Sequence, residues 1–258
     1  MNEYALITGA GRGIGKELAL QLAERGYNLL LVARSKGDLD ALAQTVATNY
    51  QVKALCLSAD LSADGAALAV ADWCKTLGVP VSILVNNAGY GLWGNFDELD
   101  LAAQMNMLKL NISALVELTY YTLPLLKKQS KAFVLNVSSV AAYQAVPSLA
   151  LYSASKAFVL SFSRALRYEQ KQGKVSVTCL CPGPTATGFA QRAGMDALQE
   201  LAEKFNMSPA EVARVGLKAM FRKKAEIVPG FLNRVSAIAA RHLNKSLVER
   251  ITASLYKK

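Results

Sequence analysis

Short runs of consecutive apolar residues alternate along this chain with longer stretches in which apolar positions recur every three or four residues. An unbroken apolar run is typical of a strand buried on both faces, and the longer period is typical of an amphipathic helix. Alternation of the two predicts a parallel sheet with helices on both sides. The pattern predicts strands near residues 4–8, 28–33, 53–58, 82–86, 132–138, 175–181 and 225–229.

The 258 residues contain no internal repeat, low-complexity tract or charge block that would mark a linker. A chain of this length can bury one large core. We therefore expect an α/β protein with a doubly wound parallel sheet of about seven strands. Its single domain is expected to cover residues 1–230, and residues 231–258 are expected to form an amphipathic helical extension packed on the same domain.

A glycine-rich turn follows the first predicted strand, Tyr4–Thr8, in the sequence Gly9-Ala10-Gly11-Arg12-Gly13-Ile14-Gly15. An amphipathic helix with Leu18 and Leu22 on one stripe comes next. Glycines allow a close approach of the backbone, and the amides at a helix N-terminus favour an anion. This predicts a diphosphate site. The spacing differs from G-x-G-x-x-G, and the alternative is an ordinary tight turn.

Tyr152 and Lys156 are four residues apart in a predicted helix, so both side chains lie on one face. A nearby ammonium lowers the pKa of a tyrosine, which can then donate or remove a proton near neutral pH. Ser139 follows the apolar run Phe133–Val137, so its hydroxyl is expected at the carboxyl edge of the sheet. The alternative is a solvated Tyr and Lys pair. The arrangement predicts proton transfer at a substrate oxygen.

Further motifs join these in order, namely Asn86-Asn87-Ala88-Gly89, Asn111 and Pro182-Gly183. Together they resemble the classical short-chain dehydrogenase/reductase family over residues 4 to about 230. The resemblance implies a Rossmann-like domain that binds a nicotinamide cofactor. It implies a catalytic tetrad in which Asn111 holds a water, Ser139 orients the substrate carbonyl, Tyr152 is the acid/base and Lys156 lowers its pKa and binds the ribose.

The resemblance also assigns cofactor contacts along the chain. Asn87, Ala88 and Gly89 would support the central strand and line the ribose of the adenosine, and Asp60 and Leu61 would lie at the adenine. Pro182, Gly183, Thr185 and Thr187 would flank the nicotinamide. The complete expected cofactor set is Thr8, Gly9, Gly11, Arg12, Gly13, Ile14, Gly15, Arg34, Asp60, Leu61, Asn87, Ala88, Gly89, Tyr152, Lys156, Pro182, Gly183, Thr185 and Thr187.

The end of the second predicted strand addresses the choice between NAD and NADP. A carboxylate there binds the ribose hydroxyls of NAD, whereas a basic residue accommodates the extra phosphate of NADP. Here the strand ends in Ala33-Arg34-Ser35-Lys36, with no carboxylate at that point, and Arg12 in the glycine turn is a second cation. The sequence predicts NADP(H). The alternative is that Arg34 and Lys36 are ordinary surface cations.

The net charge of +10 is concentrated near the C-terminus, since residues 201–258 carry twelve Lys and Arg but only four Glu. After residue 230, apolar positions at helical spacing alternate with Arg234, Arg241, Lys245 and Arg250. We expect this unit to pack on its own domain with a solvated basic face. An anionic membrane surface, an acidic partner and a second subunit are the alternatives. No nucleic-acid recognition motif accompanies the charge.

Cysteine and histidine give no sign of metal or redox chemistry. Cys56, Cys179 and Cys181 lie in predicted strands, Cys74 lies in a helix, and none forms a C-x-x-C unit. His242 is the only histidine, which disfavours a Ser-His-Asp hydrolase. The first strand begins at once, and no charge-free apolar segment is long enough to span a bilayer. We expect no metal and a cytoplasmic location.

Two segments resemble the pocket wall and the lid of the family, Tyr90–Phe96 and Pro184–Phe189. With Val140, Tyr143, Val146 and Met195 they predict a largely apolar cavity around one polar focus. The expected substrate is an apolar ketone, aldehyde or secondary alcohol. The alternatives are an NADP(H)-binding regulator without turnover and a lyase or epimerase that retains its cofactor. The family resemblance implies a homo-oligomer, either a dimer or a tetramer.

Overall fold

A computed structural model describes residues 3–188, 193 and 207–255 of the chain. Its strands are β1 (Tyr4–Thr8), β2 (Asn28–Ala33), β3 (Ala54–Ser58), β4 (Val81–Asn86), β5 (Ala132–Val137), β6 (Val175–Leu180) and β7 (Glu226–Ile227). Its helices are α1 (Gly13–Glu24), α2 (Lys36–Asn49), α3 (Ala66–Leu77), α4 (Leu101–Leu108), α5 (Ala114–Lys127), α6 (Ala150–Glu169), α9 (Pro209–Phe221), α10 (Phe231–His242) and α11 (Lys245–Leu255). A π-helical turn, η1 (Lys109–Ser113), joins α4 to α5, and a 3₁₀ turn, η2 (Val140–Tyr143), follows β5.

All seven strands are parallel and form one sheet in the order β3-β2-β1-β4-β5-β6-β7. The strand order reverses direction between β1 and β4, which is where open α/β sheets form their ligand crevice. The predicted α/β fold with a doubly wound sheet is confirmed. Because both carboxyl ends meet there, the glycine turn after β1 and the Asn-rich segment after β4 become neighbours.

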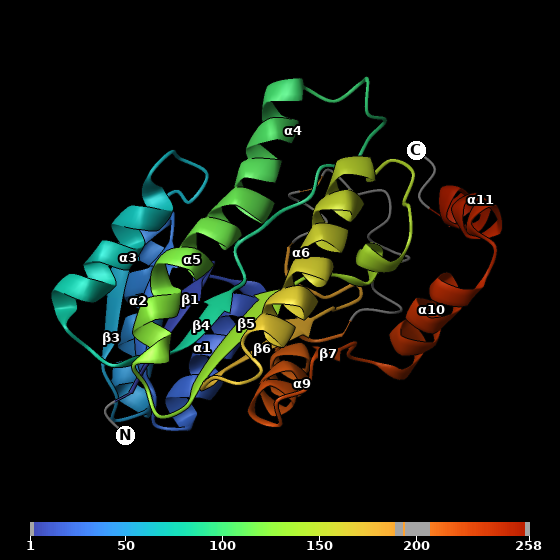
Figure 1. Ribbon diagram of the computed structural model, residues 1–258. Helices are drawn as coiled ribbons and strands as arrows, with labels where there is room; N and C mark the ends of the chain where they lie inside the picture. Colours follow the sequence, from blue (N-terminus) through green and yellow to red (C-terminus); the bar gives the residue numbers. More distant parts are fainter. Residues whose placement is uncertain (1–2, 189–192, 194–206, 256–258) are drawn as a thin grey trace.

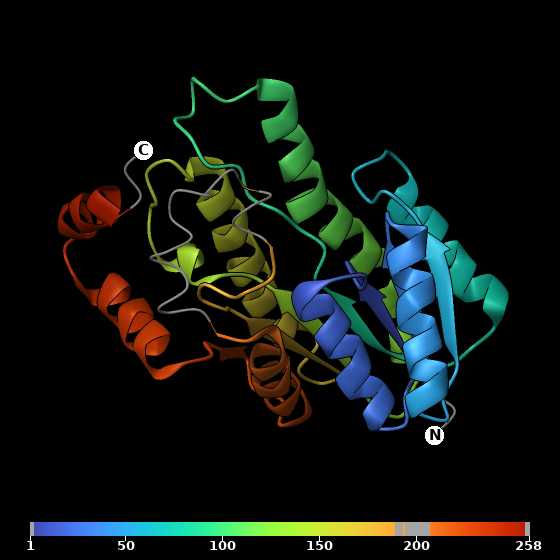
Figure 2. The same cartoon turned by 180° about the vertical axis from the view of Figure 1, so that it is seen from behind.

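Helices cover both faces of this sheet (Figures 1 and 2). The core beneath α1, α2 and α9 takes Ala5 and Ile7 from β1, whereas the core beneath α3, α5 and α6 takes Tyr4 and Leu6 from the same strand. Successive side chains of a strand point to opposite faces, so burial on both sides requires an uninterrupted apolar run. Burial on both faces is the reason that the apolar runs of the sequence predicted these strands.

The last strand is shorter than the predicted span of residues 225–229. Only Glu226 and Ile227 pair with β6. Pro229 follows closely and has no backbone N–H to donate to a ladder. Val228 instead packs beside Leu160, Cys179 and Cys181. The edge of the sheet therefore ends early, and the chain turns at Gly230 into α10.

Helices α10 and α11 lie beyond β7 at one edge of the molecule, as both views show in red (Figures 1 and 2). Glu226 on β7 accepts hydrogen bonds from Arg241 of α10 at 2.6 Å and from the Tyr143 hydroxyl at 2.6 Å. Arg164 of α6 adds an ion pair to the same carboxylate. Across the described ranges, no helix has the length and apolar character required to cross a bilayer.

Candidate active site

The glycine turn after β1 is shaped by residues that cannot carry a side chain. Gly9 and Gly13 have φ values of 63° and 55°, in the left-handed region that favours glycine. A Cβ at Gly15 would lie 2.2 Å from the Gly9 carbonyl oxygen and 2.5 Å from Asn87 Nδ2. No side chain caps the first amides of α1, which starts at Gly13. The turn therefore presents backbone N–H groups to an anion, as a diphosphate cradle requires.

Thr8 and Asn87 fasten the end of β4 to this turn. The Thr8 hydroxyl donates to the Val85 carbonyl and accepts from the backbone N–H groups of Asn87, at 3.0 Å, and Ala88, at 3.1 Å. The Asn87 amide donates to the carbonyls of Thr8 and Gly9 at 3.0 and 3.1 Å. Residues that the sequence placed in one cofactor site are thus in direct contact.

A carboxylate of α2 lies beside the glycine turn, close to the end of β2, and it was not identified from the sequence. Arg12 donates from Nε to Asp38 Oδ2 at 2.8 Å and from Nη2 to Oδ1 at 3.3 Å. The hydrogen bond from Arg12 is the main reason that the pKa of Asp38 is lowered. Ser35 caps α2, which turns Asp38 back against Gly11. The residues that directly end β2, Ala33 to Lys36, contain no carboxylate, but the first turn of α2 brings Asp38 against the glycine turn.

Arg34 is exposed, and its carbonyl accepts a hydrogen bond from Ser58 at the end of the neighbouring strand. Asp60 accepts hydrogen bonds from the backbone and hydroxyl of Ser62, which lower its pKa. Leu61 is buried in the core beneath α3. Arg34 and Asp60 thus line the same end of the sheet as the glycine turn, while Leu61 contributes mainly to the core.

Lys156 is buried on α6 beside Tyr152. Its ammonium donates to the Val137 carbonyl at 3.1 Å and lies 5.7 Å from the centre of the Tyr152 ring. Burial lowers the pKa of Lys156 to about 8, so the ammonium still predominates at neutral pH. Tyr152 is 9% exposed. The predicted pair therefore shares one face of α6 in a poorly solvated environment, where a cation acts strongly on a neighbouring phenol.

Asn111 lies in the π-helical turn and is buried. Its amide accepts from the Tyr90 N–H at 3.1 Å and donates to the Tyr90 carbonyl at 2.9 Å and to Ser155 Oγ at 3.1 Å. A Cβ on Gly89 would lie 2.9 Å from Asn111 Oδ1 and 3.2 Å from Lys156 Nζ. The predicted Gly89, Asn111 and Lys156 therefore converge, and π-helical turns often mark functional positions.

Ser139 follows β5 at the same edge of the sheet. Its hydroxyl oxygen accepts a hydrogen bond from the Ala141 N–H at 3.1 Å and so begins η2. A hydroxyl that accepts can still donate its own hydrogen to a third group. The adjacent Ser138 donates to the Lys156 carbonyl at 2.7 Å, which ties β5 to α6. Ser138 and Ser155 support the site without any motif that would have identified them.

The segment after β6 folds over the glycine turn. A Cβ at Gly13 would lie 2.9 Å from the Thr187 side chain, so Thr187 covers the start of α1. The Thr185 hydroxyl donates to the Gly183 carbonyl at 2.9 Å. Gly183 is pressed by Asn233 of α10, which would lie 2.4 Å from a Cβ at that position. Asn233 was absent from the predicted site because only the folded chain brings α10 to this loop.

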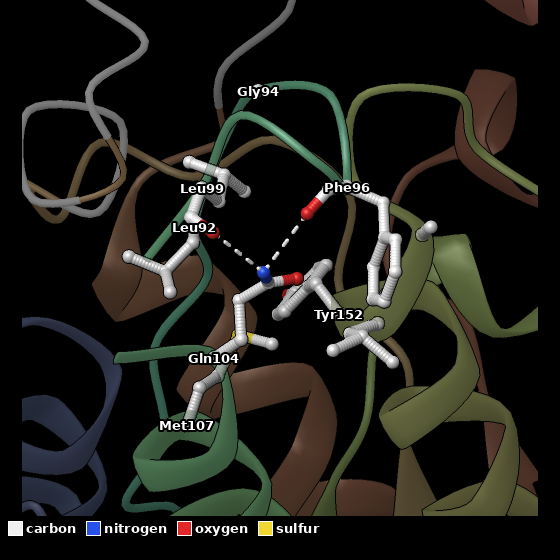
Figure 3. A pocket seen from close by; sticks show the side chains of 9 residues that line it. Leu92, Gly94, Phe96, Leu99, Gln104, Met107 and Tyr152 are labelled. Atoms are coloured by element: carbon white, nitrogen blue, oxygen red, sulfur yellow. Dashed lines mark hydrogen bonds between the residues drawn. The ribbon is translucent and has the colours of Figure 1, made fainter. Parts of the chain in front are cut away.

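A small pocket with both polar and apolar lining lies beside Tyr152 (Figure 3). Gln104 of α4 donates from Nε2 to the carbonyls of Phe96 and Leu99, both at 3.0 Å, and so holds the segment after β4 over the pocket. Met107 packs in the same cluster as Tyr152, Trp93 and Val146. The lining residues are Leu92, Gly94, Phe96, Leu99, Gln104, Met107, Ala150, Leu151 and Tyr152.

One expected pocket residue, Tyr143, lies elsewhere. Tyr143 packs with Leu160 and Cys181, and its hydroxyl donates to Glu226, so it faces the C-terminal edge and not Tyr152. The 3₁₀ turn after Ser139 sets the direction of the Tyr143 side chain. The apolar pattern of the sequence predicts strands and α-helices but not such a turn. Met195 and Phe189 lie outside the described residues. Among those described, no group of three metal-ligating side chains occurs.

The chain is similar to known proteins in sequence and in structure. A family profile for short chain dehydrogenases matches residues 3–198. The human 17-beta-hydroxysteroid dehydrogenase type 3 is 31% identical over 93% of this chain and 77% of its own. The mouse very-long-chain 3-oxoacyl-CoA reductase is 28% identical over 99% of this chain and 81% of its own. A solved short-chain dehydrogenase from Sphingobium yanoikuyae in complex with NADPH has a TM-score of 0.83, 30% identity and 92% coverage of both chains.

Proposed function

The chain belongs to the short-chain dehydrogenase/reductase family, and on that premise we propose that it transfers a hydride between NADP(H) and an apolar carbonyl or secondary alcohol. The observation that carries the proposal is the buried Lys156 ammonium beside Tyr152, at the same edge of the sheet as a glycine cradle. Burial of a cation next to a phenol is the arrangement needed to give that phenol a proton-transfer role.

Tyr152 is the proposed proton donor to the carbonyl oxygen during reduction and the proton acceptor in the reverse direction. The Lys156 ammonium favours the phenolate that remains after donation. Ser139 donates its hydroxyl hydrogen to the same substrate oxygen and so orients the carbonyl. Asn111 is proposed to hold a water of the proton relay. Its side chain lies in the π-helical turn and forms hydrogen bonds with the backbone N–H and carbonyl of Tyr90.

The residues present fit a dinucleotide. Gly9, Gly13 and Gly15 let the turn pack where a Cβ would clash with neighbouring atoms of the protein, and no N-cap side chain covers the first amides of α1. The nicotinamide, when bound, supplies or accepts the hydride. Thr187 and Thr185 are proposed to hold the nicotinamide side, since this segment covers the start of α1. Lys156 is also proposed to bind the adjoining ribose.

The preference for NADP(H) is proposed from the cations Arg34 and Arg12. Replacing Arg34 with alanine is expected to weaken NADPH binding by about ten- to a hundredfold, the range for a hydrogen bond to a charged group. NADH affinity should change little, because NADH lacks the extra phosphate. Fluorescence titration of both cofactors measures this. Equal losses for NADH and NADPH would contradict the assignment.

A change at Asp38 tests the role of Arg12 from the other side, because Asp38 forms an ion pair with the Arg12 guanidinium. The Asp38→Asn variant removes the ion pair and a negative charge near the proposed phosphate. NADPH binding is expected to tighten by up to about fivefold, consistent with the small free energy of an exposed pair. If the same variant weakens NADPH and leaves NADH unchanged, Arg12 does not contribute as proposed.

The pocket beside Tyr152 supports an apolar substrate, since leucine, phenylalanine and methionine side chains line most of it. The human relative is named for a hydroxysteroid and the mouse relative for a very-long-chain 3-oxoacyl thioester. Both names describe carbonyl or hydroxyl chemistry on a large apolar body. We propose a substrate of that class.

The direct test is loss of NADPH absorbance with a panel of apolar ketones and aldehydes, including steroid ketones. Stoichiometric formation of the alcohol is the expected result. Conversion of a substrate without net NADPH consumption would instead identify a lyase or epimerase that retains its cofactor. Tight NADPH binding with no conversion of any ketone, aldehyde or alcohol in either direction would favour the regulatory alternative.

Burial of Lys156 also predicts how stability depends on pH. The folded pKa of about 8 lies below the ordinary value of 10.5, so between these values the unfolded chain binds more protons. The free energy of unfolding should therefore rise with pH across this window, and this contribution is lost as pH falls through 8. Urea unfolding without cofactor, compared with Lys156→Met, isolates it. A gap between the two proteins that is constant with pH would refute the shift.

We further propose that two copies associate through α5 and α6. Tyr120 on α5 and Phe158 and Tyr168 on α6 are exposed by 73, 41 and 69% of their surfaces. Helices α5 and α6 pack on the same face of the sheet, and large apolar side chains exposed on such helices are typical of a protein interface.

A further inference from the structure

The outer stripe of α10 consists of Phe231, Leu232, Val235 and Ile238. These side chains are exposed by 80, 65, 48 and 48%. The opposite face of the helix contacts the domain, where Ala237 is buried and Asn233 meets Gly183. The expectation that this unit packs on its own domain accounts for that inner face only. The outer stripe has no counterpart within the described chain.

The apolar exposure continues after α10. Leu243 in the connection and Leu247 and Ile251 of α11 are exposed by 47, 43 and 48%, whereas Val248 is buried. Both helices have a strong separation of apolar and polar positions but little overall hydrophobicity. This combination is characteristic of helices that lie in the plane of a membrane interface. Figures 1 and 2 place both helices at the edge of the molecule.

Cations without an ion pair occur on the same two helices as the exposed apolar residues. Arg234, Lys245 and Arg250 form no ion pair with any described residue. Arg241 forms an ion pair with Glu226. Glu249 is the only acidic residue in the sequence from 231 to 254. The surface is therefore apolar and positive, and it complements an apolar layer bounded by negative groups.

The charge also distinguishes the membrane from a second copy. A two-fold contact brings the same patch of each subunit together, so the positive patch that carries Arg234, Lys245 and Arg250 would face another positive patch. Such like-charge contact is unfavourable. An anionic bilayer supplies both the apolar environment and the opposite charge. We propose that α10 and α11 form a peripheral binding surface for membranes that contain anionic phospholipids.

The test is co-sedimentation of the full chain with vesicles of phosphatidylcholine, with and without phosphatidylglycerol. The chain is expected to sediment with the anionic vesicles, and added salt should weaken this, since screening shortens the reach of the cations. The Leu232→Ser variant should bind about tenfold more weakly, which is about 1.4 kcal/mol of lost apolar insertion. The Arg234→Glu variant should lose the preference for anionic vesicles.

Leu101→Ser is the matched control, because Leu101 on α4 is exposed by 62% against 65% for Leu232. It should leave vesicle binding unchanged, and both variants should retain the thermal unfolding of the parent. No sedimentation, or equal sedimentation with neutral and anionic vesicles, would overturn the proposal. So would a Leu232→Ser variant that only halves the mass in analytical ultracentrifugation, because a second copy would then cover the surface.

Discussion

Replacing Tyr152 with phenylalanine is expected to reduce turnover by about 10²- to 10⁴-fold, the usual contribution of a positioned acid or base. The change removes one hydroxyl and leaves the ring that packs with Trp93, Met107 and Val146. Cofactor affinity should therefore remain close to that of the parent. Turnover with saturating NADPH and a reactive ketone, together with a cofactor titration, measures both quantities.

Tyr168→Phe is the control, since it makes the same chemical change on the same helix at a side chain that is 69% exposed. It should have full activity. Substantial residual turnover in Tyr152→Phe would remove this tyrosine from the proposed role. A parallel fall in cofactor affinity would show that the variant had lost the shape of the site and not only its proton donor.

Replacing Gly15 with alanine is expected to abolish the cofactor cradle. The new methyl group would lie 2.2 Å from the Gly9 carbonyl oxygen and 2.5 Å from Asn87 Nδ2, and the Gly9 carbonyl cannot retreat without moving the backbone of the turn. Overpacking of this kind costs about 1–3 kcal/mol of stability. Cofactor affinity should fall by at least about tenfold, the equivalent of 1.4 kcal/mol of distortion at the diphosphate amides. Titration and urea unfolding measure these effects.

Gly173→Ala tests whether the effect belongs to the position. Gly173 lies in the turn before β6, has no positive φ, and its Cβ would lie 3.4 Å from the nearest atom, the Gln170 carbonyl oxygen. Cofactor binding should be unchanged in this variant. If Gly15→Ala binds NADPH as tightly as the parent, the turn is not the diphosphate site.

The sheet could be predicted because its central strands β1, β4 and β5 are buried on both faces, which leaves runs rich in apolar residues in the sequence. The convergence of Gly89, Asn111 and Lys156 could be anticipated from motif order and family resemblance. The sequence cannot show where a helix cap turns Asp38 back onto Arg12, or that Asn233 reaches Gly183 from α10. These contacts depend on how distant elements dock, so no local pattern encodes them.

The C-terminal unit shows the same limit in another form. Its period predicted amphipathic helices, and α10 and α11 are present. Which face turns inward is decided by Asn233, Ala237 and the Arg241 pair with Glu226. The large apolar residues that suggested a packed inner face lie outward instead. Periodicity predicts that two faces exist, but the partner of each face is fixed by tertiary contacts.

The hydrogen bonds between Thr8 and the segment after β4 have a consequence for the order of folding. They join residues 79 positions apart, and loop closure over such a distance precedes any stabilisation from the contact. The glycine turn, although among the first residues synthesised, acquires its walls only when the fourth strand docks beside the first. An emerging chain shorter than this segment would hold no nucleotide, so acquisition of cofactor affinity marks closure of the central sheet.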